Sequence, residues 1–291
     1  MMRNPTAGNP KKPRPVQLEI VVPAYNEAER LPVGLSLLTR KAADLPLSTS
    51  ILVVDNASTD ETPDIVRDWP AEPVPVRLLQ CARRGKGAAV RAGLLATRAP
   101  FTGFCDADMA TDLSAMDVVI RLLATGHPAV IGSRAHRGSV VEARHSAFRT
   151  AGACVFRGLA RLVVAGATDT QCGFKFFSGP LARAAAGRLR TGGFAFDVEL
   201  IARCIQLGAS VTEIPVYWRD VPGSTFSARR HGPSALWDIA SMWLNLKLKR
   251  PDVPGERTVP LYVPLPRTGD GFKTASGPVL EPGAVAATPQ S

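Results

Sequence analysis

The sequence predicts an α/β domain built on a doubly wound, mostly parallel sheet that is flanked by helices. Short apolar strands alternate with loops and helical segments four times within residues 16–111, which is the pattern of strand–helix–strand units. Three of these strands run directly into acidic or amide side chains, at the position where open α/β sheets bind ligands. The chain has 291 residues, of which 45% are hydrophobic, so it can bury the core of one large domain.

The first four strands and three helices follow one another at short intervals. Pro32 is typical of a first helical turn, and Ser58 or Thr59 can cap the second helix. We expect strands at 16–22, 50–55, 76–81 and from 101 to the aspartate at 106, and helices at 32–43, from the cap to 69, and from the glycines at 85 and 87 to about 97. Parallel strands with right-handed crossovers bring their carboxyl ends to one side, so the polar side chains after them should converge on one crevice.

The second half of the chain continues the pattern. A fifth strand is expected at 129–133, where it delivers Arg134, and further strands are expected up to Phe177 and at 211–218, with a helix at 196–207. Two more helices are expected at 148–165 and 235–249, each with an apolar side and basic residues beside it. Either helix can pack on the domain or lie at a membrane surface, and the sequence leaves both possibilities open.

The ends of the chain differ in composition from the middle. Residues 1–15 are basic and rich in Pro and Asn, and residues 251–291 are rich in Pro and Gly, so both are expected to be disordered tails around one domain at 16–250. No stretch reaches about 18 uninterrupted apolar residues, and the N-terminus lacks the apolar run of a signal peptide, so we expect a cytoplasmic protein. The five cysteines have no paired spacing, which indicates thiols rather than a disulfide framework or a zinc site.

The charge balance favours an anionic partner. Lys and Arg number 35 against 25 Asp and Glu, which gives a formal net charge of +10. The basic residues are dispersed, aromatic residues make up only 6%, and the sequence has no zinc finger, helix-turn-helix or RNP signature. Nucleic acid is therefore disfavoured relative to a phosphorylated substrate or an anionic membrane.

Asp106 and Asp108 are the strongest candidates for chemistry, because they come directly after a short apolar strand with one residue between them. Mg²⁺ takes oxygen ligands and is usually bound by one or two carboxylates together with the phosphates of a substrate. A nucleoside diphosphate is the natural third partner. The same pattern also occurs in solvated turns after strands, so the metal site depends on its context.

Eight segments supply that context: VVPAYNE, VVDNASTDET, RRGKGAAVRAG, CDADMAT, IGSRAH, DTQCGFKFF, FAFDVELI and VPGS, in this order. With them the chain resembles glycosyltransferase family 2, in particular its dolichyl-phosphate β-glucosyltransferase and polyprenyl-phosphate sugar synthase branch, over residues 17–245. The resemblance implies a GT-A-type fold in a single catalytic domain, with a nucleotide half at 16–134 and an acceptor half at 135–250.

The resemblance also assigns residues. Asp106 and Asp108 would hold Mg²⁺ or Mn²⁺ on the diphosphate, with Asp108 preferred as the direct ligand, and Asp197 matches an acidic residue in the sugar-binding part of the site. Together with Arg134 these are the residues expected to act in catalysis. The nucleotide would be bound by Pro23, Tyr25, Asn26, Glu27, Asp55 and Lys86, with Asp55 on the base, and the acceptor phosphate by Arg134, Arg144 and Arg149.

Three positions depart from the family pattern. Asn56 and Ala57 stand where the family usually has Asp-Gly, and Arg83 stands where Asn is usual. Mannosyl-transferring relatives often carry Gln two residues after the second metal aspartate, where this chain has Ala110, so glucose from UDP-glucose is favoured over mannose from GDP-mannose.

The expected reaction is an inverting transfer to a lipid phosphate. Such an acceptor is already anionic at neutral pH and needs no general base, so catalysis consists of positioning and of stabilising the leaving diphosphate. A soluble enzyme acting on a hydroxyl acceptor would need Asp197 or Asp169 as base, and a non-catalytic anion-binding module is a further alternative. A lipid acceptor implies contact with an anionic membrane, with the protein peripheral on its inner face, where each basic residue contributes about 1 kcal/mol.

Overall fold

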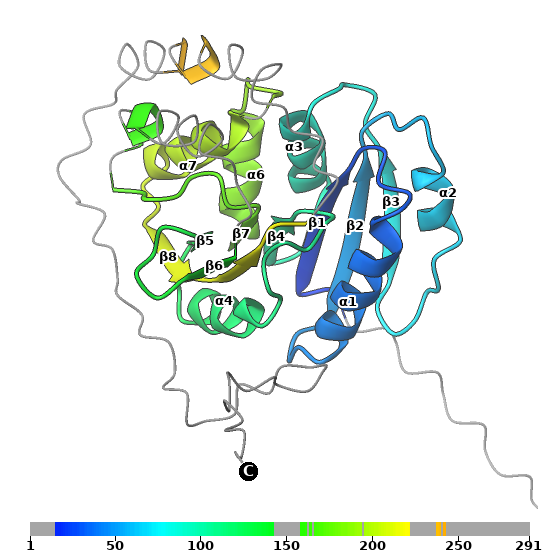
Figure 1. Ribbon diagram of the computed structural model, residues 1–291. Helices are drawn as coiled ribbons and strands as arrows, with labels where there is room; N and C mark the ends of the chain where they lie inside the picture. Colours follow the sequence, from blue (N-terminus) through cyan, green and yellow to red (C-terminus); the bar gives the residue numbers. More distant parts are fainter. Residues whose placement is uncertain are drawn as a thin grey trace, which may run out of the picture.

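A seven-stranded sheet forms the centre of the molecule (Figure 1). The computed structural model describes residues 15–142, 158–161, 163–164, 166–193, 195–221, 237–239 and 241–242. Within them the sheet has the order β3-β2-β1-β4-β7-β5-β8, and it is mostly parallel, as predicted. Its strands are β1 Leu18–Ala24, β2 Thr49–Asp55, β3 Val76–Gln80, β4 Phe101–Cys105, β5 Ala129–Ser133, β7 Phe174–Ser178 and β8 Val211–Pro215.

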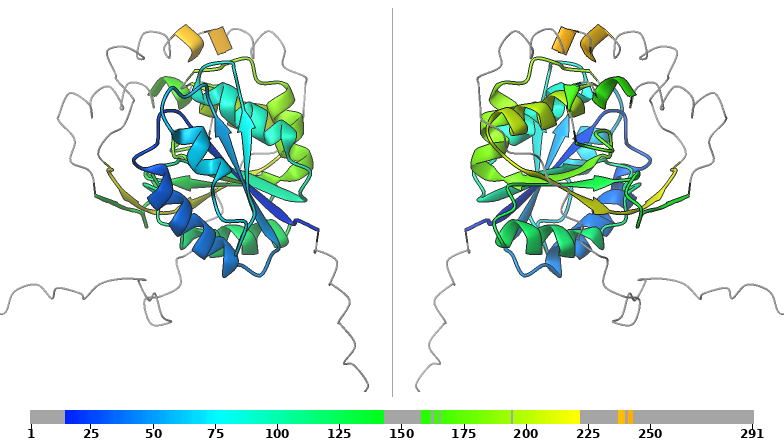
Figure 2. Two further views of the ribbon diagram at one scale, coloured as in Figure 1. Left: turned by 90° about the vertical axis from the view of Figure 1, so that its right-hand side faces the viewer. Right: turned by 90° about the vertical axis from the view of Figure 1, so that its left-hand side faces the viewer.

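Helices cover both faces of this sheet, which gives three layers (Figures 1 and 2). Helices α1, α2 and α4 contribute to the core on one face, and α3, α6 and α7 to the core on the other. The bounds are α1 Leu31–Ala43, α2 Thr62–Arg67, α3 Lys86–Ala96, α4 Ala115–Ala124, α6 Gly179–Gly187 and α7 Phe196–Gln206. Helices α4 and α6 were not predicted from the sequence. None of the helices in the described residues is long and apolar enough to cross a membrane.

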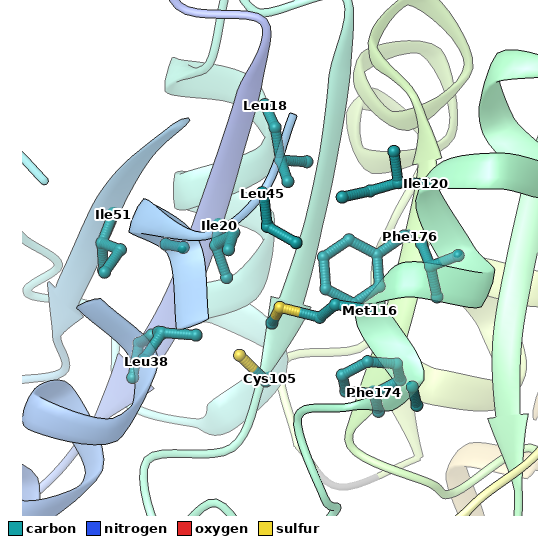
Figure 3. Packing of buried hydrophobic residues seen from close by; sticks show 14 of the residues in the cluster. Leu18, Ile20, Leu38, Leu45, Ile51, Cys105, Met116, Ile120, Phe174 and Phe176 are labelled. Carbon is teal, nitrogen blue, oxygen red and sulfur yellow. The ribbon is translucent and has the colours of Figure 1, made fainter. Parts of the chain in front are cut away.

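The larger core lies between the sheet and the helices α1 and α4 (Figure 3). In α1 the apolar residues recur every three or four positions, so Leu31, Leu35 and Leu38 all point at the sheet and are fully buried. Phe174 and Phe176 of β7 pack edge to face in the same cluster, with ring centroids 4.9 Å apart. Of the cysteines in the described residues, three are buried and Cys81 is partly exposed, and all four are free thiols, as expected.

Strand β7 is antiparallel to both of its neighbours, β4 and β5. In the register, Phe174 lies opposite Cys105, so the amino end of β7 meets the carboxyl end of β4. The loop that precedes β7 therefore reaches the same edge of the sheet as the loops that follow β1, β2, β4 and β5. This edge carries the candidate site.

The last predicted strand, 211–218, is wrong as a single element. The main-sheet strand β8 ends at Pro215, and a separate strand β9, Tyr217–Arg219, pairs in parallel with β6, Val140–Glu142, in a second small sheet. Proline has no N–H to donate and is confined to edge strands or strand ends, which explains the break. After it, β9 runs along the loop that follows β4: Arg219 N–H donates to Ala110 O at 2.9 Å, and Asp112 N–H to Tyr217 O at 2.9 Å.

The second predicted helix begins later than its expected cap. It starts at Thr62 with Pro63 in its first turn, because Ser58 and Thr59 are used in the loop instead. Ser58 Oγ accepts a hydrogen bond from Asn26 N–H at 3.0 Å, and Thr59 N–H donates to Asn26 Oδ1 at 2.8 Å. These bonds join the loops after β1 and β2.

Two predicted helices lie largely outside the described residues. Of the helix at 148–165, residues 158–161 and 163 are helical, and of that at 235–249, residues 237–239 and 241–242. Ile239 and Met242 are buried against α7 in a third apolar cluster, whereas Trp237 is 76% exposed. The expected tails lie outside the described residues, apart from Pro15, and the domain limits stay predictions.

Candidate active site

The carboxyl edge of the sheet brings together side chains from seven loops or helix ends. They come from the loops after β1, β2, β4 and β5, from the loop before β7, and from the amino ends of α3 and α7. The sequence predicted that the loops after the strands converge here. The loop before β7 joins them because β7 runs antiparallel to its neighbours.

Asp106 and Asp108 lie on the tight loop after β4. Asp106 N–H donates to Gly173 O at 3.1 Å, and a Cβ on Gly173 would stand 2.0 Å from Asp106 Oδ2, so a larger residue there would displace the Asp106 carboxylate. Asp108 Oδ1 accepts a hydrogen bond from Ala110 N–H at 3.1 Å. Burial, followed by the charge of Asp106, raises the pKa of Asp108. The two carboxylates therefore concentrate negative charge at one point.

Glu27 adds a third carboxylate nearby. It forms a two-bond ion pair with Arg30, at 2.6 Å for Oε1 to Nη2 and 2.8 Å for Oε2 to Nε. Burial raises the pKa of Glu27, Arg30 opposes that rise, and the charges of Asp108 and Asp106 add to it. The loop after β1 therefore lies close enough to Asp106 and Asp108 for their charges to affect the pKa of Glu27.

Lys86 is the cation beside this cluster. Its Nζ lies 2.6 Å from Asp106 Oδ1, at the first residue of α3. Burial alone would lower the pKa of Lys86, but Asp106, Asp197 and Asp108 outweigh it and raise the pKa to about 12. Gly85, with φ +118°, makes the turn into the helix, and a Cβ there would stand 2.2 Å from Gly192 O. Lys86 is therefore positively charged at neutral pH, and the backbone just before it passes close to the backbone at Gly192.

Asp197 interacts with the same cation through its charge. It is almost fully buried at the start of α7 and forms an ion pair with Lys175 of β7, whose Nζ lies 2.6 Å from Asp197 Oδ1. Lys175 is completely buried and also donates to Cys172 O at 2.5 Å. Burial raises the pKa of Asp197, while the charges of Lys175 and Lys86 oppose the rise. Lys175 was not among the residues predicted from the sequence.

Arg134 follows β5 and is held on several sides. Its guanidinium donates to Asp169 through Nε at 2.7 Å and Nη2 at 2.9 Å, and its backbone N–H donates to the same carboxylate at 2.9 Å. The guanidinium carbon also lies 5.6 Å from the centre of the Trp218 ring of β9. Burial alone would raise the pKa of Asp169, but the hydrogen bonds and charge of Arg134 lower it to about 2.

Asn56, which departs from the family pattern, connects two loops of the candidate site. Its Nδ2 donates to Arg83 O at 2.7 Å, and its Oδ1 accepts from Gly85 N–H at 2.7 Å. An aspartate could not donate to the Arg83 carbonyl, so the amide joins the loop after β2 to the loop before α3. Neighbouring Ala57 has φ +60°, the left-handed conformation for which a glycine is the usual residue.

The structure thus brings many of the predicted site residues to one edge, while their roles stay predictions. Asp106, Asp108, Glu27, Lys86 and Asp197 form one electrostatically linked group. Asp55 lies at the same edge but is 4% exposed and accepts Ser58 N–H at 3.2 Å, and Asn26 joins two loops. Pro23 and Tyr25 end β1 and begin its loop, and Tyr25 is 37% exposed. Arg144 and Arg149 lie outside the described residues.

The donor set fits a hard divalent cation. Asp106 and Asp108 offer carboxylate oxygens, the ligands that Mg²⁺ and Mn²⁺ take, and the pKa of Asp108 is raised by burial first and by the charge of Asp106 second. Within the described residues no group of three or more His, Cys, Asp or Glu side chains could hold a metal alone. Two carboxylates without a complete protein cage suit a metal that shares its ligands with a phosphate substrate.

Comparison with known proteins points in the same direction. The sequence profile described as Glycosyl transferase family 2 matches residues 19–178. A Drosophila melanogaster protein named dolichyl-phosphate beta-glucosyltransferase is 37% identical over 224 residues, covering 72% of this chain and 69% of that protein. Proteins of the same name from Dictyostelium discoideum, with 72% and 68% covered, and Mus musculus, with 72% and 69%, are 34% and 35% identical.

Solved structures support the fold. Glucosyl-3-phosphoglycerate synthase from Mycobacterium tuberculosis in complex with UDP superimposes with a TM-score of 0.60 at 16% identity, covering 81% of this chain and 82% of that one. The same protein in complex with Mn²⁺, UDP-glucose and phosphoglyceric acid gives a TM-score of 0.59 at 16% identity, with 81% of each chain covered. At this identity the likeness concerns the architecture alone.

Proposed function

The chain belongs to glycosyltransferase family 2 and is a glycosyltransferase, and from that premise we propose that it moves glucose from UDP-glucose to the phosphate of a polyprenyl or dolichyl lipid, with inversion and with a divalent metal. One observation carries this proposal. A carboxylate pair with a lysine beside it, and a rigidly held arginine, share one edge of the sheet. The carboxylate pair with its lysine suits a nucleoside diphosphate, and the arginine suits a second phosphate, that of the acceptor.

The donor side consists of Asp106, Asp108 and Lys86. A Mg²⁺ or Mn²⁺ ion held by the two carboxylates would stabilise the charge of the departing diphosphate. The Lys86 ammonium is protonated throughout the neutral range, so it can supply further positive charge to the same leaving group. The charge of Asp197, at the start of α7, also favours the protonated form of Lys86. The solved complexes of the structural relative with Mn²⁺ and UDP-glucose support this type of donor.

The acceptor side favours a phosphate over a hydroxyl. A hydroxyl acceptor needs a general base, and Asp169 and Asp197 were the two candidates. Asp169, with a pKa of about 2 and both oxygens bonded to Arg134, is a poor base. Asp197 is buried in an ion pair with Lys175. A lipid phosphate is anionic already, and the name shared by the curated relatives, dolichyl-phosphate beta-glucosyltransferase, supports that acceptor.

The lipid acceptor also implies that the protein associates with an anionic membrane surface from the cytoplasmic side without spanning it. The net charge of +10 supports such an association. Flotation of the purified protein with vesicles that contain anionic lipid tests it. We expect binding at low salt that weakens as salt increases, and a protein that ignores such vesicles even at low salt contradicts the association.

The decisive experiment is a transfer assay with the full chain. UDP-glucose and GDP-mannose are each offered with polyprenyl phosphate, with the corresponding free polyprenol and with 3-phosphoglycerate, with and without Mg²⁺ or Mn²⁺. We expect an acid-labile glucosyl lipid only from UDP-glucose, polyprenyl phosphate and metal.

Two variants complete the assay. Asp108→Ala should abolish the product. Asp112→Ala, on the same loop but bonded to Ser114 N–H at 2.8 Å, should keep both activity and metal dependence. Transfer from GDP-mannose would overturn the donor, transfer to polyprenol or 3-phosphoglycerate would overturn the acceptor, and full activity without metal would overturn the role of the carboxylate pair.

A further inference from the structure

The Arg134 guanidinium is already engaged by the protein on its Nε side. Asp169 takes the N–H of Nε and one N–H of Nη2 in a fork, and accepts the backbone N–H of Arg134 as well. Within the described part of the chain, Nη1 has no hydrogen-bond partner. The side that remains for an anion is therefore the Nη1 group and the second N–H of Nη2.

Asp169 is itself held by a second buried carboxylate. Glu213 of β8 is 9% exposed, and its Oε1 accepts the backbone N–H groups of Thr168 and of Asp169. Its Oε2 accepts the Thr168 hydroxyl, which also bonds Ser133 Oγ at 3.0 Å. The loop that carries Asp169 is thus fixed to two neighbouring strands, β5 and β8.

The charges on Arg134 and Asp169 cancel, which distinguishes this pair from a plain basic patch. A neutral pair attracts an anion weakly at a distance, but a fixed guanidinium edge offers two N–H groups in one direction at no further cost in side-chain entropy. The pair thus supplies direction to the incoming phosphate rather than net charge.

We propose that Asp169 and Glu213 are positioning residues for the transfer: Glu213 holds the loop that carries Asp169, and Asp169 turns Arg134 so that its Nη1 side receives the acceptor phosphate. This rests on the proposed function, because it deepens the role of Arg134 in that reaction. It makes the affinity for the lipid phosphate depend on two carboxylates that never touch it.

Asp169→Asn distinguishes a positioning role from a charge-balancing role, because the two roles predict opposite changes in KM for polyprenyl phosphate. If Asp169 positions Arg134, the variant raises KM for polyprenyl phosphate and lowers kcat/KM by about 10- to 100-fold, as misplacement of a binding group does, with little change in KM for UDP-glucose. If Asp169 only balances charge, its removal leaves a net positive site, so KM for the lipid phosphate falls and becomes more sensitive to salt. The second result overturns the proposal.

A double-mutant cycle with Arg134→Lys tests whether Asp169 acts through the arginine. Lysine keeps the charge but lacks the fork, so adding Asp169→Asn to Arg134→Lys should lower kcat/KM by less than about twofold. Additive losses overturn the proposal. Glu213→Gln should raise KM for polyprenyl phosphate by a smaller factor than Asp169→Asn. An unchanged KM would overturn the positioning role of Glu213.

A readout that needs no turnover keeps this proposal separate from the proposed function. In the full chain labelled with ¹⁵N-arginine, the Arg134 Nε–H signal is identified by its loss in Arg134→Lys. We expect a slowly exchanging signal in the wild type that is lost or exchanges rapidly in Asp169→Asn. The control Glu19→Gln breaks an arginine–carboxylate pair, with Arg77, at the opposite edge of the sheet, and should leave the Arg134 signal and the kinetics unchanged.

The outcomes are distinct. A wild type that shows the protected signal but transfers nothing to a lipid phosphate overturns the proposed function and leaves the positioning of Arg134 standing. An Arg134 signal that is the same in the wild type and in Asp169→Asn overturns the positioning, whatever the enzyme transfers.

Discussion

Removal of the buried lysine of β7 should destabilise the protein through the carboxylate left behind. Lys175 is completely buried and Asp197 is 5% exposed, with Nζ and Oδ1 2.6 Å apart. Lys175→Met preserves most of the side-chain volume but leaves Asp197 buried without this partner. Breaking a buried ion pair in this way costs about 3–5 kcal/mol in the free energy of unfolding. The double variant Lys175→Met/Asp197→Leu removes both charges and should recover most of that loss.

The loss should depend on pH in a definite direction. Burial raises the pKa of Asp197 above its ordinary value near 3.8, and in the single variant the opposing charge of Lys175 is gone, so the pKa rises further. A carboxyl with a higher pKa in the folded state than in the unfolded state favours folding when it is protonated. Through Asp197 both proteins should therefore lose stability as pH rises above about 4, and the variant should fall below the wild type once pH passes the Asp197 pKa of the folded wild type. From there the variant should lose up to about 1.4 kcal/mol per pH unit more than the wild type, until Asp197 is ionised in the folded variant.

Urea unfolding of the wild type, the single variant and the double variant between pH 5 and 8 measures this difference. The double variant lacks Asp197, so its free energy of unfolding should vary less with pH over this range than that of the single variant. A single variant whose free energy of unfolding stays within about 1 kcal/mol of the wild type at pH 8, or whose deficit is the same at pH 5 and pH 8, would refute the assignment of Asp197 as a buried anion stabilised by Lys175.

Three further changes test the loops of the site. Asn56→Asp loses the donor to Arg83 O and places a carboxylate against that carbonyl, so urea unfolding should show a loss of about 1–3 kcal/mol; an unchanged midpoint would contradict the bridge. Ala57→Gly removes the strain of a non-glycine residue in the left-handed conformation, at φ +60°. Once the extra freedom of the unfolded chain is subtracted, urea unfolding should show that the variant is more stable by about 0.5–1 kcal/mol. A destabilised variant would show that the backbone at this position carries no strain. Gly173→Ala puts a methyl 2.0 Å from Asp106 Oδ2, so the metal concentration for half-maximal transfer should rise about 10- to 100-fold in a titration with Mg²⁺, and an unaltered titration would separate this loop from the metal site.

Much of the sheet and of its active edge was predictable because both depend on local patterns. Apolar runs that end in carboxylates identify strands whose polar ends meet, and Asp106 and Asp108 could be named as candidates from that pattern, although a metal role for them depends on the context of the other segments. The direction of β7 could not, because an apolar run such as FKFFS carries no information on whether its neighbours run parallel or antiparallel. That direction is what brings Asp169 to the site.

Other features left a signal that was not used. A lysine in the middle of an apolar strand is seldom buried without an ionic partner, so Lys175 indicated an ion pair, although nothing local identifies Asp197 as the partner. Pro215 indicated the end of β8 for the same reason that prolines end other strands. The two bonds of Asn56 depend on a loop more than 25 residues away, which sequence reasoning about a single turn does not reach.

The place of β7 in the sheet has a consequence for how the chain folds. It lies between β4 and β5 although it follows both in sequence, and the family profile matches residues up to 178, where β7 ends. Until these residues are available, β4 and β5 each keep an unpaired edge, and such edges are prone to association with other chains. Pairing over so long a separation is slow. The insertion of β7 between β4 and β5 also places Gly173 against Asp106. The joining of the two parts of the sheet and the assembly of the site should therefore occur together, late during synthesis.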